Sequence, residues 1–190
     1  MREEYKGMII EVEQDDDPWD PREWDNNLGI MACFHGRYNL GDHGHGIDST
    51  DYAGWDEMEA GIFRKYDVAV ILPLYLYDHG NIHIKVGDWY SEPLPQGHAR
   101  FDSGQVGFIF ATKKAARGAF GCHRISKRLL HQTENYLRSE VDTYNKYISG
   151  EVYCYTITDP DGDYIVGSCS SFFSPGEARE EAVAMVNGLK

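Results

Sequence analysis

Residues 68–86, "VAVILPLYLYDHGNIHIKV", contain the pattern that decides the fold. A nearly continuous apolar run occupies 68–77, turn-forming residues follow at 78–81, and 82–86 alternate between apolar and polar residues. Alternation with a period of two is typical of a strand that buries one face, whereas a short apolar run between turns is typical of a strand buried on both faces. The stretch therefore predicts a β-hairpin, with a bulge or an unpaired edge at Pro73, because proline has no N–H to donate.

The same patterns predict the other central elements. Strands are expected at 7–13, 28–34 and 105–111, and the last, "QVGFIFA", should lie inside a sheet because it is apolar on both faces. Helical spacing of apolar residues predicts helices at 52–65 and 125–148 and a short one at 113–120. The apolar stripe of the long helix comprises Ile125, Leu129, Tyr136, Leu137, Val141, Tyr144 and Ile148.

The C-terminal third predicts a hairpin over 151–173 followed by a helix, with Ser174 as its cap, Pro175 in the first position and Glu177 completing a capping box. A two-residue turn at Asp161-Gly162 would place Cys154 opposite Cys169, and a three-residue turn would not.

Together the elements predict an α+β fold, with a mainly antiparallel sheet packed against a long helix and a C-terminal helix. We expect one domain over 1–190, in which 1–27 form an acidic strand and loop and 151–190 form the C-terminal hairpin plus helix.

The composition of the chain indicates the cellular compartment in which the protein is expected to fold. The chain has 190 residues, 42% of them hydrophobic, which is enough for a core without metal or disulfide staples. It begins without a signal-peptide pattern, and no window approaches eighteen consecutive apolar residues, so we expect no membrane association. The four cysteines form no CxxC pair, which favours thiols in a reducing compartment. The expected location is the bacterial cytosol.

Charge is the most informative bulk property. The formal net charge is −13, and residues 1–102 hold 21 acidic and 8 basic side chains whereas 103–190 hold 10 of each. This sign disfavours direct nucleic-acid binding, which needs phosphate-neutralising cations. It favours a protein partner with a basic, nucleic-acid-binding surface. The residues expected to bind that partner lie in one acidic segment with two tryptophans: Asp15, Asp16, Asp17, Trp19, Asp20, Glu23 and Trp24.

The stretch "CFHGRYNLGDHGHG" (33–46) raises the question of a metal site. Imidazole and carboxylate groups bind zinc, and the candidate ligands are His35, His43, His45 and Asp48. A metal-dependent hydrolase with Asp42 or Asp48 as base is one alternative. However, the loop is rich in glycine and lacks the ligand spacings of known zinc motifs, so the sequence favours a connection with no metal or other cofactor.

No nucleophile elbow, phosphate-binding loop or dinucleotide fingerprint occurs, so we expect a non-enzymatic protein without catalytic residues. A second alternative is a protein that sequesters a small nucleotide signal. Its pocket would be lined by aromatic and polar side chains, with an arginine for a phosphate: Arg37, Tyr38, Tyr75, Tyr77, His79 and Gln105. The sequence leaves the oligomeric state open.

Four segments, "CFHGRYNLGD", "VILPLYLYDHG", "FDSGQVGFIFATK" and "LRSEVDTYNKYISGEVYCY", resemble a family of hypothetical proteins encoded by bacteriophages and mobile plasmids. The resemblance covers about residues 24 to 170. It implies a genomic setting rather than a chemistry. Accessory proteins of such elements often inhibit host defence, so the resemblance suggests, by analogy, an inhibitor of a CRISPR effector or restriction enzyme.

Overall fold

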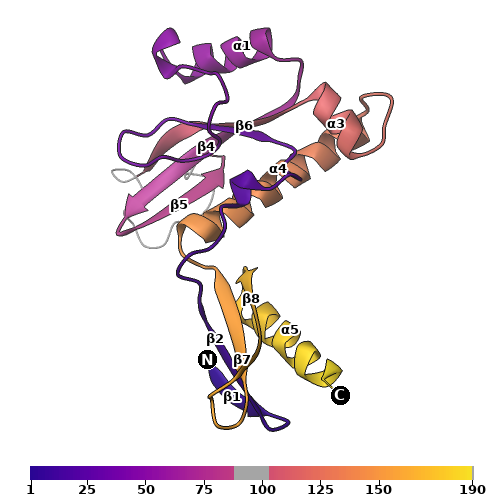
Figure 1. The fold of residues 1–190 in the computed structure, drawn as a ribbon. Coiled ribbons are helices and arrows are strands. Elements are labelled where there is room, and N and C mark those ends of the chain that lie inside the picture. The colour runs from indigo at the N-terminus through magenta and orange to yellow at the C-terminus, as the bar shows by residue number, and fades with distance from the viewer. Residues whose placement is uncertain (88–102, 190) are drawn as a thin grey trace. The chain divides into compact units, whose positions relative to one another are not determined.

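The computed structural model describes residues 1–87 and 103–189, and the chain divides into two compact units (Figure 1). Unit 1 comprises Met1–Pro21 and Lys146–Lys190, and unit 2 comprises Arg22–Asn145. About 35% of the residues are helical and 32% are in strands, which confirms the α+β class. The strands form two four-stranded sheets, and every pairing in them is antiparallel.

Unit 1 is built from both ends of the chain. Its sheet, here called sheet A, has the order β1-β2-β7-β8, and the helix α5 (Pro175–Gly188) packs on it. The strands are β1 (Arg2–Tyr5), β2 (Met8–Gln14), β7 (Tyr153–Thr158) and β8 (Ile165–Phe172). The predicted N-terminal strand and C-terminal hairpin therefore belong to the same sheet, and β1 is an additional strand that the sequence pattern does not indicate.

The core of unit 1 follows the strand alternation. Ile10 and Val12 on β2 and Tyr155 and Ile157 on β7 are buried in one cluster with three small or branched residues of α5: Ala178, Ala182 and Val186. The predicted helix start is confirmed, because Ser174 Oγ accepts a hydrogen bond from the N–H of Glu177 at 3.1 Å and Pro175 is the first helical residue.

The connection between β7 and β8 is longer than a two-residue turn. The N–H of Asp159 donates to the carbonyl of Tyr164 at 3.0 Å, and Gly162 N donates to Asp159 O at 3.0 Å, so four residues lie between the closing pair. With register shifts on both sides, Cys169 lies opposite Tyr155 and not opposite Cys154. The four cysteines are free thiols.

Unit 2 contains the second sheet, sheet B, with the order β3-β6-β4-β5. Its strands are β3 (Ile30–Cys33), β4 (Val68–His79), β5 (Asn81–Val86) and β6 (Ser103–Thr112). The helices are α1 (Trp55–Lys65), α3 (Lys113–Ala119) and α4 (Lys127–Ile148), the last of which continues past the boundary of the unit at Asn145. Short 3-10 turns occur at Pro21–Glu23, where the unit begins, and at Ser49–Asp51. The predicted hairpin at 68–86 is confirmed as the pair β4 and β5.

The interior position of "QVGFIFA" is confirmed, since β6 lies between β3 and β4. A Cβ at Gly107 would overlap the carbonyl oxygen of Ala32, so only glycine allows the two strands to approach. Pro73 pairs with Phe108 on one side, while pairing with β5 begins one residue later, at Leu74. A register shift between Leu74 and Tyr75 supplies the irregularity expected beside the proline.

The long helix α4 buries four of the seven residues of the predicted stripe; Tyr136 and Ile148 are half-buried, and Ile125 precedes the helix, which begins at Lys127. Leu129, Leu137, Val141 and Tyr144 are each at most 2% exposed. A Cβ at Gly29 would lie 2.5 Å from Leu137 and 2.8 Å from Ile109, which places the helix next to β6 at this point. None of the described helices is both long and apolar enough to span a membrane.

Candidate functional site

The acidic segment that follows β2 is mostly exposed in unit 1. Asp16 and Asp17 are exposed, and Trp19 is 63% exposed although it is a large aromatic residue. Asp15 differs, because it is half-buried and its Oδ1 accepts the N–H of Asp17 at 3.2 Å. We therefore assign Asp15 a local structural role and regard Asp16, Asp17 and Trp19 as the accessible part of the segment.

The remaining residues of the predicted partner surface have other environments. Asp20 is half-buried in unit 1, whereas Glu23, which is exposed, and Trp24, which is half-buried, belong to unit 2. The predicted surface is therefore divided between the two units.

The negative charge is concentrated in unit 1. This unit has 15 acidic and 5 basic side chains, and unit 2 has 16 and 13, which gives net charges of −10 and −3. The sequence places the whole excess in the first half of the chain, but in three dimensions the acidic residues of both ends contribute to one unit.

Strand alternation keeps many of these carboxylates at the surface. On β2, Ile10 and Val12 are buried in the core while Glu11 and Glu13 are exposed, so the two glutamates lie on the sheet face opposite to α5. One carboxylate has a counter-charge, since Arg179 Nε lies 2.8 Å from Glu3 Oε1. Such a surface attracts cations and basic proteins, because the electrostatic potentials of its charges add to one another over about a Debye length.

A cavity of about 270 Å³ in unit 2 brings together part of the predicted ligand pocket. Arg37 and Gln105 line it, as do His35, Asp78 and Ser103. The guanidinium of Arg37, which is 75% exposed, lies 3.3 Å from the Asp78 carboxylate. The opening is therefore polar and carries a positive and a negative group side by side.

Successive side chains of β4 point to opposite faces of sheet B, so only alternate residues line this cavity. Leu76 and Asp78 line it, and Tyr75 and Tyr77 alternate with them along the strand and are not among the lining residues. Tyr38 borders a neighbouring cavity and donates its hydroxyl to Asp78 Oδ1 at 3.3 Å. The side chain of His79 lies outside the described residues.

His35 has a defined hydrogen-bonding state in this loop. Its Nδ1 accepts the backbone N–H groups of Arg37 at 3.3 Å and Tyr38 at 3.2 Å, so in the neutral ring Nε2 carries the proton. The ring also stacks on Tyr38, with centroids 5.0 Å apart. Nε2 of the neutral ring is therefore a hydrogen-bond donor, and His35 is one of the residues that line the cavity.

The four candidate metal ligands have separate roles. His45 packs edge-on against Phe34, and its Nδ1 accepts the N–H of Ile47 at 3.1 Å. Asp48 caps the turn at Ser49–Asp51, and His43 is exposed beside Asn39. Over residues 1–87 and 103–189, no three or more His, Cys, Asp or Glu side chains are grouped so that they could hold a metal ion.

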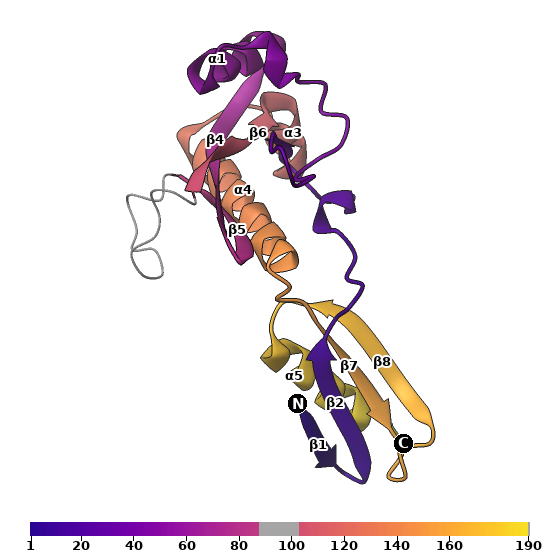
Figure 2. The same cartoon turned by 90° about the vertical axis from the view of Figure 1, so that its left-hand side faces the viewer.

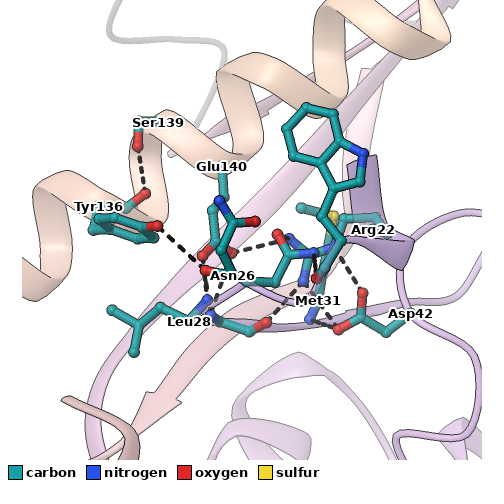
Figure 3. Close-up of polar contacts among 11 residues, drawn as sticks. Arg22, Asn26, Leu28, Met31, Asp42, Tyr136, Ser139 and Glu140 are labelled. Carbon is teal, nitrogen blue, oxygen red and sulfur yellow. Dashed lines mark hydrogen bonds and ion pairs between the residues drawn. The ribbon is translucent and has the colours of Figure 1, made fainter. Parts of the chain in front are cut away.

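A buried ionic network that no sequence motif indicates lies beside these loops (Figure 3). The side chain of Arg22 is 3% exposed and lies between Asp42 and Glu140, the latter on α4. Its N–H groups donate to both Asp42 oxygens at 2.7 and 3.1 Å, to Glu140 Oε2 at 2.9 Å, to Asn27 Oδ1 at 3.1 Å and to the carbonyl of Gly29 at 2.7 Å.

The two carboxylates also hold backbone amides. Glu140 Oε1 accepts the N–H of Leu28 at 2.5 Å, and Asp42 Oδ2 accepts that of Met31 at 2.9 Å. Burial raises the pKa of Glu140, while Arg22 and the amides of Leu28 and Gly29 act in the opposite direction. The available sequence signal is Glu140 itself, a carboxylate that shares the buried helix face with Leu137, Val141 and Tyr144.

Comparison of the chain with protein-family models, with curated proteins and with solved structures finds no match.

Proposed function

We propose that this protein is a non-enzymatic inhibitor of a bacterial defence complex, a CRISPR effector or a restriction enzyme, and that it acts in the bacterial cytosol. In this proposal unit 1 occupies a basic, nucleic-acid-binding surface of the target. The observation that carries the proposal is the net charge of −10 on unit 1, against −3 on the larger unit 2.

The physical basis is charge complementarity. A groove that binds nucleic acid is lined with lysine and arginine, and an acidic protein surface competes for the same cations. Complementary potentials raise the association rate and disfavour acidic partners. Trp19, 63% exposed beside Asp16 and Asp17, supplies the kind of large aromatic anchor that dominates binding energy in many interfaces.

The buried carboxylates of unit 2 favour a structural rather than a catalytic role. Asp42 and Glu140 are both bound to Arg22 and to backbone amides. A carboxylate engaged in this way serves to position the chain. Inhibition by occupation of a surface requires no reacting group.

DNA cleavage assays test the proposal. Purified full-length protein is added to a panel of bacterial restriction enzymes and CRISPR effectors, and the inhibition constants are measured. The variant Glu13→Gln/Asp16→Asn/Asp17→Asn, which removes three exposed charges from unit 1, should weaken inhibition at least tenfold. A matched control, Asp51→Asn/Asp56→Asn/Glu59→Gln, makes the same charge change in unit 2 and should remain within about twofold of the wild type.

Two results would contradict the proposal. Equal weakening by the two variants would mean that total charge, and not unit 1, determines inhibition. If cleavage is unaffected by the wild-type protein in every complex of the panel, and none of the complexes is retained on the immobilised protein, a defence complex is not the target.

A second candidate, sequestration of a small nucleotide, rests on the cavity of about 270 Å³ with His35, Arg37 and Gln105 in its lining. A ligand that binds only the folded state raises its melting temperature. A panel of nucleotides should then stabilise the wild-type protein and not Arg37→Ala. If no nucleotide in the panel shifts the melting temperature, this candidate is removed.

A further inference from the structure

The two edges of sheet A differ in a way that folding alone does not require (Figure 2). Strand β1, at one edge, has four residues and three of them, Arg2, Glu3 and Glu4, are charged. Strand β8, at the other edge, has eight residues, "IVGSCSSF", with neither a charged side chain nor a proline. Short length and charge are the usual devices that stop an edge strand from pairing with another chain. β1 has both devices and β8 has neither.

The free side of β8 is regular over a short stretch. Gly167, Ser168 and Cys169 pair in succession with Ile157, Thr156 and Tyr155 of β7. Register shifts bracket this stretch, and Ser171 has a φ of 69°. Within the described residues β8 has a strand neighbour on one side alone, so its outward N–H and C=O groups over this stretch are available to a short added strand.

Exposed apolar side chains lie where β8 begins and beside it. Tyr164 is 70% exposed and Ile165 is 62% exposed. Met185 of α5 is also exposed, and a Cβ at Gly167 would lie 2.5 Å from its Cε, so this methionine lies against the first residue of the regular stretch. Aromatic and methionine side chains are enriched in interface cores, which makes Tyr164 and Met185 suitable contact residues for a bound segment.

The rim of this edge is acidic. Asp161 and Asp163 are exposed in the connection that leads into β8. Cys169 pairs with Tyr155, so both lie on the sheet face that α5 covers, and α5 carries the exposed Glu181. Two basic groups of the unit have partners elsewhere: Arg179 pairs with Glu3 on β1, and Lys6 donates to Asn187 at 2.6 Å.

We propose that β8 is a docking strand, to which an extended, lysine- or arginine-rich segment of the target protein adds as a fifth strand of sheet A. Main-chain hydrogen bonds to Gly167–Cys169 would supply affinity, as in other cases of strand addition, and the acidic rim would select basic side chains. This inference rests on the proposed function, because the segment belongs to the basic partner of unit 1.

The test uses full-length ¹⁵N-labelled protein and a nine-residue peptide in which lysine alternates with valine and threonine. The amide signals of Gly167–Cys169 should shift on titration, and hydrogen exchange should slow at least tenfold where the N–H points away from β7. Two further peptides have the same charge but carry N-methyl groups on alternate residues, one in each phase. At least one of them should bind at least tenfold more weakly, because it cannot pair along the edge.

A matched pair of variants tests the edge position. Thr156 and Ser168 are cross-strand partners on one sheet face, but Thr156 is on the interior strand β7. Ser168→Lys should weaken peptide binding at least fivefold more than Thr156→Lys does, although both make the same change in net charge. The N-methylated peptides provide the same information if a variant does not fold.

Several outcomes would overturn the docking strand. Peptide-induced shifts at Asp16–Trp19 with none in β8 would do so while leaving the proposed function intact. Protection of β8 that rises with protein concentration and needs no peptide would identify a second copy of the chain as its occupant. Conversely, strand addition without any inhibition of DNA cleavage would support the docking strand and contradict the defence complex as the target.

Discussion

Arg22 and Asp42 form a two-pronged ion pair inside unit 2, with Nε 2.7 Å from Oδ1 and Nη2 3.1 Å from Oδ2. Glu140, on α4, lies 2.9 Å from the same guanidinium. The three residues connect the segment that enters β3, the histidine-rich loop and the long helix. Planar guanidinium groups suit this geometry because they donate in fixed directions.

Replacement of Arg22 by alanine should strongly destabilise the protein. The substitution leaves Asp42 and Glu140 in a poorly solvated site without their cation, and breaking a buried pair in this way costs about 3–5 kcal/mol. Urea unfolding followed by fluorescence measures the loss. Arg124→Ala, at an exposed position, is the control and should change the free energy of unfolding by less than about 0.5 kcal/mol. Similar effects of the two changes would show that the network does not stabilise the fold.

Phe108→Ala should cost about 3–5 kcal/mol, since the ring is 2% exposed and its removal leaves a cavity in sheet B. Trp55 packs edge-on against this ring with centroids 6.0 Å apart, so quenching or a shift of tryptophan emission should accompany the loss. The control Phe63→Ala removes a ring that is 51% exposed and should have little effect. A cost below about 1 kcal/mol at Phe108 would mean that β6 is misplaced.

His45 should make stability depend on pH. Burial lowers the pKa of His45 below its ordinary value of 6.5; nearby Asp42 acts to raise it and Lys65 and His43 to lower it further. The unfolded chain therefore takes up this proton at a higher pH than the folded chain. The stability contributed by neutral His45 is fully present above about pH 6.5 and is lost as pH falls through the folded pKa.

The measurement compares wild type with His45→Gln across this range. The difference in the free energy of unfolding should be largest above pH 6.5, where Nδ1 holds the N–H of Ile47, and should shrink on acidification. His43→Gln removes a group that lowers the pKa of His45, so it should leave the stability above pH 6.5 unchanged and reduce the loss on acidification. A difference that is constant with pH would contradict the assignment. Addition of EDTA should change neither the stability nor these differences.

The cysteines should differ in reactivity. Burial raises the pKa of Cys33 to about 12, and because the thiolate is the reacting form, alkylation at pH 8 should be at least about a hundredfold slower at Cys33 in the folded chain than in urea. Cys169 is exposed and should react readily in both states. Peptide mass spectrometry after timed iodoacetamide treatment separates the sites. Rapid labelling of Cys33 in the native protein would contradict its raised pKa.

Binding of unit 1 to its basic partner should weaken with salt. Exposed charges are screened over about 8 Å at physiological ionic strength, so the association rate should fall as NaCl is raised from about 50 to 500 mM. The variant Glu13→Gln/Asp16→Asn/Asp17→Asn should associate more slowly at low salt and show a smaller salt dependence. Surface plasmon resonance with the inhibited complex measures both. An association rate indifferent to salt and to the variant would exclude electrostatic attraction by these residues.

The sequence by itself determines the local structure of this protein. The alternation in 68–86 predicts the pair β4 and β5, and the apolar run "QVGFIFA" predicts an interior strand, because strand periodicity and burial are encoded in neighbouring residues. The cap at Ser174 and the stripe of α4 are predictable for the same reason. The excess of acidic residues is likewise evident from composition alone.

Tertiary structure alone decides which distant segments meet. β2 pairs with β7, far along the chain, so the acidic residues of both ends belong to one unit of net charge −10, which a count along the sequence does not reveal. Arg22 binds Glu140, which lies 118 positions further along the sequence. Asp78 and not Tyr77 lines the cavity, because neighbouring residues of β4 face opposite sides of the sheet. Local propensity acts over a few residues, whereas these contacts depend on the packing of whole elements, and periodicity carries no information about which elements pack together.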